Sequence, residues 1–118
     1  MTDSNLAPVA LFVYNRLDNT RRTLAALANN RLAPETELYI FSDGGRDERS
    51  WRAVNAVRAF LHEFKHTAER DRRFHRVTII ERPENYYLER NIIEGIAALF
   101  AHHETVIVLE DDICTGPG

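Results

Sequence analysis

Three acidic residues stand next to one another near the end of the chain, directly after an apolar run. Residues 106–109 are valine, isoleucine and leucine, and Glu110, Asp111 and Asp112 follow them. Adjacent like charges repel one another, most strongly where water is scarce. A divalent cation relieves this repulsion, and carboxylate oxygens suit Mg²⁺ or Mn²⁺, which complete their coordination with phosphate oxygens and water. The pattern indicates a divalent-cation site, and its alternatives are a solvated acidic loop or a helix N-terminus.

Polar residues also follow three earlier apolar runs. Tyr14, Asn15 and Arg16 stand at the end of the first run, Asp43 and two glycines follow the second, and the polar segment 81–91 ends the third. Each of these alone has the composition of an ordinary turn. In an open parallel sheet, however, ligands bind beyond the carboxyl ends of the strands. The four strand ends together therefore predict one ligand site on one edge of a sheet.

The apolar runs that would position these residues span 8–14, 37–42, 76–81 and 105–110. They are rich in β-branched and aromatic residues and nearly continuous, which is typical of parallel strands covered on both faces. No glycine-rich phosphate-binding loop follows the first run. A diphosphate at this edge would then be held by other means, which again favours a metal ion.

Helical patterns separate the four runs. Asp18 or Asn19 is the expected N-cap of the first helix, and Asn29 or Asn30 is expected to end it. Ser50 is the expected N-cap of the second helix, which should end before a loop at 66–74. The third helix is expected to run over about 88–102. The apolar residues expected to face the core are Ala53, Val57, Phe60 and Phe64 in the second helix and Ile92, Ile93, Ile96, Leu99 and Phe100 in the third.

The order of strands and helices predicts the fold class. Strands that alternate with helices imply right-handed crossovers and a mostly parallel sheet. We therefore expect an α/β fold, a Rossmann-like three-layer α/β/α arrangement, in a single domain over 1–118. A chain of 118 residues is sufficient for one modest core.

Bulk properties exclude several classes of protein. The net charge of −3 gives no field that would attract nucleic acid. Cys114 is the only cysteine, so no internal disulfide is expected. The N-terminus lacks the basic region and length of a signal peptide, and no segment has the ~20 apolar residues of a membrane span. We expect a cytoplasmic protein without a transmembrane segment.

One motif points elsewhere. Residues 62–66 match the H-E-x-x-H pattern of zinc proteases, in which His62 and His66 would bind the metal and Glu63 would act as base. The helix that carries them buries other residues, and His62 is expected on its solvent side. We therefore interpret these histidines as surface residues.

The quoted segments together resemble a known family. The order "ALFVYNR", "YIFSDGGRD", "ERPENYYLERNIIEGI" and "VIVLEDD" resembles the N-terminal, nucleotide-binding half of GT-A glycosyltransferases of the family-2-like group. It is also similar to the related N-acetylglucosaminyltransferase I type, which uses an E-D-D form of the D-x-D motif. The resemblance covers nearly the whole chain, from residue 9 to residue 112.

The resemblance implies a nucleoside-diphosphate sugar as donor, with a UDP-sugar favoured, and Mn²⁺ or Mg²⁺ as cofactor. It implies that Asp112 binds the metal with Asp111 beside it, and that Asp111 and Glu110 hold ribose, sugar hydroxyls or metal-bound water. The remaining residues that it places at the nucleotide sugar are Tyr14, Asn15, Arg16, Asp43, Arg90 and Asn91.

The chain departs from the family in two places. Tyr87 stands where the family often has glycine in the third loop, so the loop is expected to close differently. The chain also ends where the family's acceptor half would begin. We expect a natural protein that continues beyond the E-D-D motif, with the catalytic base and the site for a glycan or other acceptor outside this chain.

Two alternatives remain open at this point. One is another Rossmann-like, Mg²⁺-dependent enzyme that transfers nucleotidyl or phosphoryl groups, and the other is a non-catalytic binding module of the same fold. Because the family order places the fourth strand beside the first and leaves its other edge unpaired, we also expect self-association as a homodimer through that edge.

Overall fold

The computed structural model of the protein describes residues 6–111. It contains a four-stranded parallel sheet in the order β3-β2-β1-β4. The strands are β1 (Val9–Val13), β2 (Glu37–Ser42), β3 (Arg76–Glu81) and β4 (Ile107–Glu110). The helices are α1 (Leu17–Ala28), the short 3₁₀ helix η1 (Ala33–Glu35), α2 (Glu48–Arg70) and α3 (Tyr87–Phe100).

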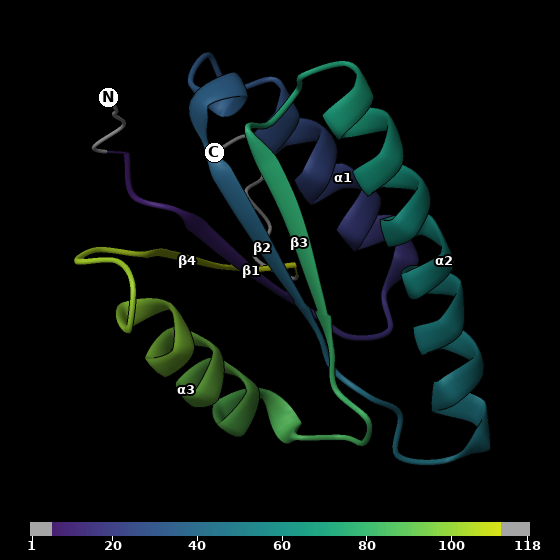
Figure 1. Cartoon of the computed structure of the whole chain (residues 1–118). Coiled ribbons are helices and arrows are strands. Elements are labelled where there is room, and N and C mark those ends of the chain that lie inside the picture. The colour runs from purple at the N-terminus through teal and green to yellow at the C-terminus, as the bar shows by residue number, and fades with distance from the viewer. Residues whose placement is uncertain (1–5, 112–118) are drawn as a thin grey trace.

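The helices cover the two faces of the sheet unequally. Figure 1 shows α1 and α2 on one face and α3 alone on the other. The predicted α/β fold with a parallel sheet between helical layers is confirmed. The predicted position of the fourth strand beside the first is also confirmed, since β4 pairs with β1.

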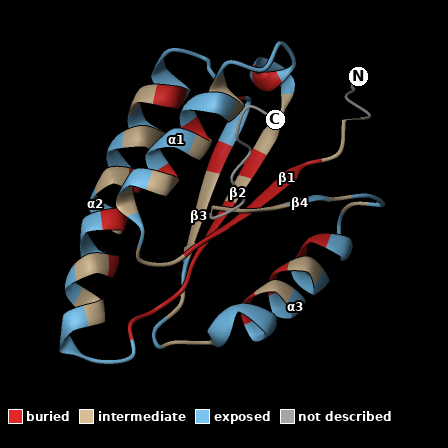
Figure 2. Ribbon diagram, turned by 180° about the vertical axis from the view of Figure 1, so that it is seen from behind, coloured by how far each residue is buried: buried red, intermediate tan, exposed pale blue. Residues whose placement is uncertain are grey.

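Strand register brings the carboxyl ends to one edge. Val13 pairs with Ser42, Ser42 with Glu81, and Phe12 with Glu110. The residues that follow β1, β2 and β4 therefore emerge side by side. All five residues of β1 are buried, and Figure 2 shows this strand as the most completely covered of the sheet.

Alternate residues of β1 supply two separate cores. Val9, Leu11 and Val13 pack towards α1 and α2, whereas Ala10 and Phe12 pack towards α3. The rings of Phe12 and Phe41 stack with their centroids 4.9 Å apart.

Gly95 allows α3 to lie close to these rings. A Cβ atom at Gly95 would lie 2.9 Å from the ring of Phe12, which is too close for an ordinary contact. Gly95 has a low helix propensity, but its lack of a side chain lets α3 pack closely against the sheet at this point.

The predicted helix caps need correction. The helix α1 begins before Asp18, so Asp18 and Asn19 lie in its first turn and do not cap it. The cap of α2 is Asp47, and Ser50 is the third helical residue of a capping box whose two side chains each bond the other residue's backbone N–H. Asn29 is the C-cap of α1, as predicted.

Two helical faces also differ from the prediction. In α2 the buried residues are Val54, Val57, Leu61 and Ala68, so the stripe is rotated by about one residue and Ala53, Phe60 and Phe64 lie half-buried at its border.

In α3 the residues with the least exposure, Asn91, Gly95 and Leu99, are spaced four apart and form a narrow contact stripe. Ile93 and Phe100 lie outside this stripe and are 59% and 52% exposed, so the prediction that they face the core is wrong.

Some boundaries are shifted. The helix α2 continues to Arg70, so residues 66–70 are helical and only the remainder of the expected loop is irregular. The strand β4 starts two residues later than predicted. No helix within residues 6–111 combines the length and apolar character that crossing a membrane requires.

Candidate functional site

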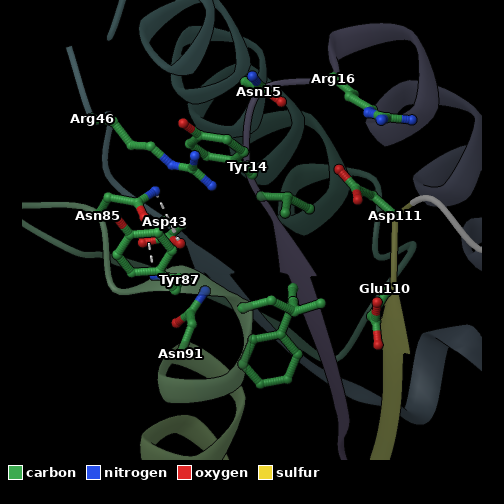
Figure 3. Close-up of a pocket in the computed structure, with 13 residues that line it drawn as sticks. Tyr14, Asn15, Arg16, Asp43, Arg46, Asn85, Tyr87, Asn91, Glu110 and Asp111 are labelled. Atoms are coloured by element: carbon green, nitrogen blue, oxygen red, sulfur yellow. Dashed lines mark hydrogen bonds between the residues drawn. The ribbon is translucent and has the colours of Figure 1, made fainter. Parts of the chain in front are cut away.

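A cavity of about 330 Å³ lies at the carboxyl ends of β1, β2 and β4, beside the first turns of α3. Figure 3 shows side chains from several loops directed around it. Its lining residues are Phe12, Val13, Tyr14, Asn15, Arg16, Asp43, Arg46, Asn85, Tyr87, Leu88, Asn91, Glu110 and Asp111.

The cavity brings together most of the residues that the sequence singles out. They come from the ends of three strands and from α3: Tyr14, Asn15, Arg16, Asp43, Asn91, Glu110 and Asp111. Arg90 is not among the lining residues, and Asp112 lies outside the described residues. The parts that these residues play in ligand binding stay predictions.

Asp43 directly follows β2, and only 4% of it is exposed. Its Oδ1 accepts hydrogen bonds from the backbone N–H of Gly44 at 2.8 Å and of Tyr86 at 2.7 Å. Among the residues that the structure describes, its Oδ2 has only a long contact, 3.4 Å, with the amide nitrogen of Asn85. One oxygen is therefore fully used by the protein, and the other can still accept a hydrogen bond from a ligand.

Two glycines allow the loops around Asp43 to lie this close. A Cβ atom at Gly44 would lie 2.5 Å from the backbone carbonyl carbon of Glu84, and one at Gly45 would lie 2.6 Å from the ring of Trp51. The loop after β2 and the loop after β3 are thus in direct backbone contact. This contact brings Asn85 beside Asp43.

Arg58 holds the ends of β2 and β3 together from α2. Its Nε donates to the Ser42 hydroxyl at 2.9 Å. Its Nη2 lies 3.2 Å from the carbonyl oxygens of Ser42 and Asp43 and 2.8 Å from that of Arg82. Burial lowers the pKa of Arg58, although an arginine stays charged. The guanidinium acts as a brace beneath the Asp43 loop.

Asn91 presents a buried amide to the cavity. The residue is 1% exposed, and its Oδ1 accepts a hydrogen bond from Nε of Arg82 at 2.9 Å. Arginine can only donate, so this contact fixes which end of the amide is oxygen. No acceptor for the amide nitrogen is found within residues 6–111. Figure 3 shows this nitrogen on the cavity side, where it can donate to a ligand oxygen.

The two acids that the structure describes at the end of β4 diverge. Glu110 pairs in register with Phe12 and so lies on the α3 face, whereas Asp111 lies on the α1 face. The buried hydroxyl oxygen of Thr20 lies 3.3 Å from Oδ2 of Asp111 and 2.8 Å from the carbonyl oxygen of Arg16. Because the hydroxyl has one proton, it can donate to only one of these two acceptors at a time. Figure 3 shows the two carboxylates pointing apart.

This divergence limits how a metal ion could be held. Within residues 6–111 no group of three His, Cys, Asp or Glu side chains is arranged to bind a metal. Mg²⁺ and Mn²⁺ commonly use one or two carboxylates together with phosphate oxygens and water. Carboxylate oxygens on the cavity wall suit that chemistry, with a ligand supplying the remaining oxygens.

Arg90 lies apart from the cavity. Its guanidinium stacks on the ring of Tyr86, 3.6 Å from the centroid, and its Nε donates to Glu94 at 2.8 Å. The bond to Glu94 raises the pKa of Arg90. The structure therefore places Arg90 in surface contacts of α3.

The zinc-protease pattern is also placed on a surface. His62 and His66 are exposed on α2. The Nε2 atom of His62 lies 2.7 Å from Oε2 of Glu81, at the end of β3. Both side chains of this pair are solvent-accessible, which agrees with the interpretation of His62 as a surface residue.

Six lining residues were not predicted as site residues, and two of them, Phe12 and Val13, were expected only as residues of the first strand. Arg46 and Asn85 stood inside segments already singled out, "SDGGRD" and "PEN", but neither was assigned a part. Tyr87 was expected only as a loop residue in the place of a common glycine, and Leu88 was expected to start a helix. Their position at the cavity depends on the contact between the two loops at Gly44, which no spacing in the sequence predicts.

Comparison with known proteins gives one positive result. The sequence model of the family described as Glycosyl transferase family 2 matches residues 9–118. Comparisons with curated proteins and with solved structures gave no match. The family match covers every strand end that lines the cavity.

Proposed function

The chain belongs to glycosyl transferase family 2, and from this premise we propose that it is the donor-binding part of a metal-dependent glycosyltransferase. The substrate would be a nucleoside-diphosphate sugar, with a UDP-sugar favoured. The observation that carries the proposal is the cavity itself. It combines a buried carboxylate at Asp43, a buried amide donor at Asn91 and the acids that follow β4.

The end of the cavity near Asp43 suits a nucleobase. The Oδ2 atom of Asp43 can accept an N–H of the base, since Oδ1 is already occupied by two backbone donors. Tyr14 and Asn15 lie on the neighbouring wall. A base bound here would place its ribose and phosphates towards β4.

The end near β4 suits the diphosphate and the sugar. Arg16 supplies positive charge there, and Asn91 can donate to an oxygen of the ligand. We assign the metal to Asp112 and Asp111, as the sequence predicts, and ribose or sugar hydroxyls to Glu110 and Asp111. A divalent cation bound there would neutralise charge on the leaving diphosphate.

The reaction would exchange one bond at the sugar for another. The bond between the anomeric carbon and the diphosphate oxygen breaks, and an acceptor hydroxyl forms the new bond. No residue of this chain is assigned as the base that takes the acceptor proton. The finer likeness to the N-acetylglucosaminyltransferase I type, and the glycan or other acceptor, stay hypotheses.

The proposal is tested by NMR, in which backbone amide signals are followed while UDP is added to the protein. The buffer contains Mg²⁺ and no Mn²⁺. We expect the signals of Tyr14, Asn15 and Asp43 to shift more than those of His62 and His66, because the first three line the cavity. Shifts centred on the two histidines would contradict the site.

A cleavage assay and the amide titration together separate the alternatives. A nucleotidyl or phosphoryl transferase would cleave a UDP-sugar with pyrophosphate, which is measured by phosphorus NMR, whereas a sugar transferase would not. A non-catalytic binding module would show no response to either the nucleotide or the cation.

A further inference from the structure

Tyr87, the first residue of α3, has an unusual backbone conformation. Its φ angle is 64°, in the left-handed region that favours glycine. A residue with a large side chain is rarely found there because its Cβ crowds the backbone. Such strain persists only where the surroundings hold it, and it gathers at functional sites.

Core packing does not explain the conformation, because Tyr87 is 60% exposed. Its backbone N–H donates to Oδ1 of Asn85 at 3.1 Å, which fixes the turn. The aromatic ring lies on the wall of the cavity that Asp43 also lines (Figure 3). What the strained backbone achieves is therefore the placement of a flat aromatic surface at the cavity.

Arg46 covers that surface. Its Cζ atom lies 4.8 Å from the centroid of the Tyr87 ring, and the residue lines the same cavity. Its backbone is fixed by a 2.8 Å hydrogen bond to the Ser50 hydroxyl at the start of α2. Within residues 6–111 no carboxylate lies within ion-pair distance of its guanidinium. Among the described residues the guanidinium packs on an aromatic face without an ion pair, although its charge also helps to lower the pKa of the neighbouring Asp47.

We propose that Tyr87 and Arg46 act together as a selectivity pair for nucleoside diphosphates. The nucleobase stacks on the Tyr87 ring in the place that the guanidinium occupies in this structure. Arg46, displaced from the ring, then pairs with the phosphates. This inference rests on the proposed function, because it names residues that determine specificity at the same site.

The chemistry of the two groups supports the exchange. A guanidinium and a nucleobase are both planar and both stack on aromatic faces. A guanidinium also forms paired hydrogen bonds with phosphate oxygens. A ligand that has both a base and phosphates satisfies both residues, whereas a ligand with phosphates alone leaves the Tyr87 ring unused.

The test compares the affinity for UDP and for inorganic pyrophosphate by calorimetry in Tyr87→Asn and Tyr87→Phe. Asparagine tolerates the left-handed region and removes the ring. Stacking on an aromatic residue contributes about 1–3 kcal/mol per base, so UDP affinity should fall roughly 5- to 150-fold in Tyr87→Asn. Tyr87→Phe should stay within about twofold of the parent, and pyrophosphate affinity should not change in either variant.

Phe100→Asn is the matched control, because Phe100 is a similarly exposed aromatic at the other end of α3. It should bind UDP like the parent. The melting temperature of Tyr87→Asn should equal or exceed that of the parent, because the strain is relieved. Lower affinity with undiminished stability supports a ligand contact and rules out a purely structural role.

Arg46→Gln tests the second half of the pair. It should weaken UDP and pyrophosphate by a similar factor, because it removes a phosphate contact common to both. If the parent binds UDP and Tyr87→Asn binds it equally well, the selectivity pair is overturned while the proposed function stands. If the parent binds no nucleoside diphosphate, both are overturned.

Discussion

At the scale of single residues, the candidate site depends on which side-chain oxygen atoms already accept hydrogen bonds from the protein. Asp43 holds two backbone N–H groups with Oδ1, whereas Oδ2 has a 3.4 Å contact with Asn85 and is the oxygen that we propose to accept from a ligand. We expect Asp43→Asn to fold normally, because the amide oxygen can replace Oδ1. UDP affinity should fall about 10-fold or more, since an amide nitrogen cannot accept the N–H of a base. Calorimetry with a thermal melt of each variant checks both expectations.

Asp43→Ala gives the comparison for that variant. It leaves two buried backbone donors without an acceptor, which costs about 1–3 kcal/mol for each. Asp43→Ala should therefore lose stability as well as affinity. An alanine variant as stable as the parent would contradict the assignment of Oδ1.

The predicted metal ligands can be tested in the same way. Mn²⁺ should bind the parent and should bind Asp112→Asn at least about 10-fold more weakly, because the substitution removes a charged oxygen ligand. Titration calorimetry measures the difference, and His62→Asn is the control for the zinc-like pattern. Equal Mn²⁺ affinity in parent and Asp112→Asn would remove the metal assignment.

At the scale of elements, α2 positions the site through its first turn and through Arg58. Arg58→Met removes the donor that serves carbonyl groups at the ends of β2 and β3. We expect a loss of about 2–3 kcal/mol in the free energy of unfolding, measured with urea. Arg52→Met, at an exposed position of the same helix, should lose little. Equal urea midpoints for the two variants would mean that Arg58 is no brace.

The capping box of α2 predicts a pH dependence. Hydrogen bonds from the backbone and side chain of Ser50 lower the pKa of Asp47. A lowered pKa means that the folded state favours the ionised form, so this stability is present above the usual aspartate pKa and is lost as pH falls through the lowered value.

Asp47→Ala should therefore melt below the parent at pH 7, and the difference should shrink in acid. Asp47→Asn caps without titrating, so its melting temperature should not share this acid dependence. Thermal melts across pH measure both variants. A constant gap between Asp47→Ala and the parent would contradict the role of ionisation.

The sequence predicted the elements better than their details. Periodicity identified every strand and every α-helix, because continuous apolar runs and helical stripes follow directly from burial, but it did not predict the short 3₁₀ helix η1. It misplaced the cap of α2, because Asp47 and Ser50 are both good caps and only the capping box decides between them. It also misjudged Ile93 and Phe100, because a helical pattern does not show how wide the contact with the sheet is.

The sequence predicted the site residues that follow strands, but not those whose position depends on contact between two loops. Strand ends placed Asp43, Asn15 and Glu110 on one edge, since parallel strands share an end. The parts of Arg46 and Tyr87 depend on tertiary contact and on a strained backbone, and the sequence showed only that Tyr87 replaces a common glycine.

At the scale of the whole molecule, the sheet is asymmetric. The strand β4 pairs with β1 on one side, and within residues 6–111 no strand pairs with its other side. Ile107 and Val108 are 49% and 38% exposed, although they point to opposite faces of the sheet. An apolar strand with a free edge is a place where a second copy can add.

We therefore expect the chain to dimerise at high concentration through β4. Val108→Lys should reduce the dimer, because a charge on an edge strand opposes pairing. Light scattering over a range of concentrations measures the mass of each variant. A parent that stays monomeric at millimolar concentration would contradict the expectation, and an unchanged dimer in Val108→Lys would place the interface elsewhere.

The backbone contact between Gly44 and Glu84 has a practical consequence for engineering. The two loops that it joins fit one another without a gap, so neither can be exchanged for a loop from a relative while the other is kept. A chimera designed to change donor preference would have to transplant both segments together, with their glycines. Libraries that vary one segment at a time would mainly sample misfolded proteins.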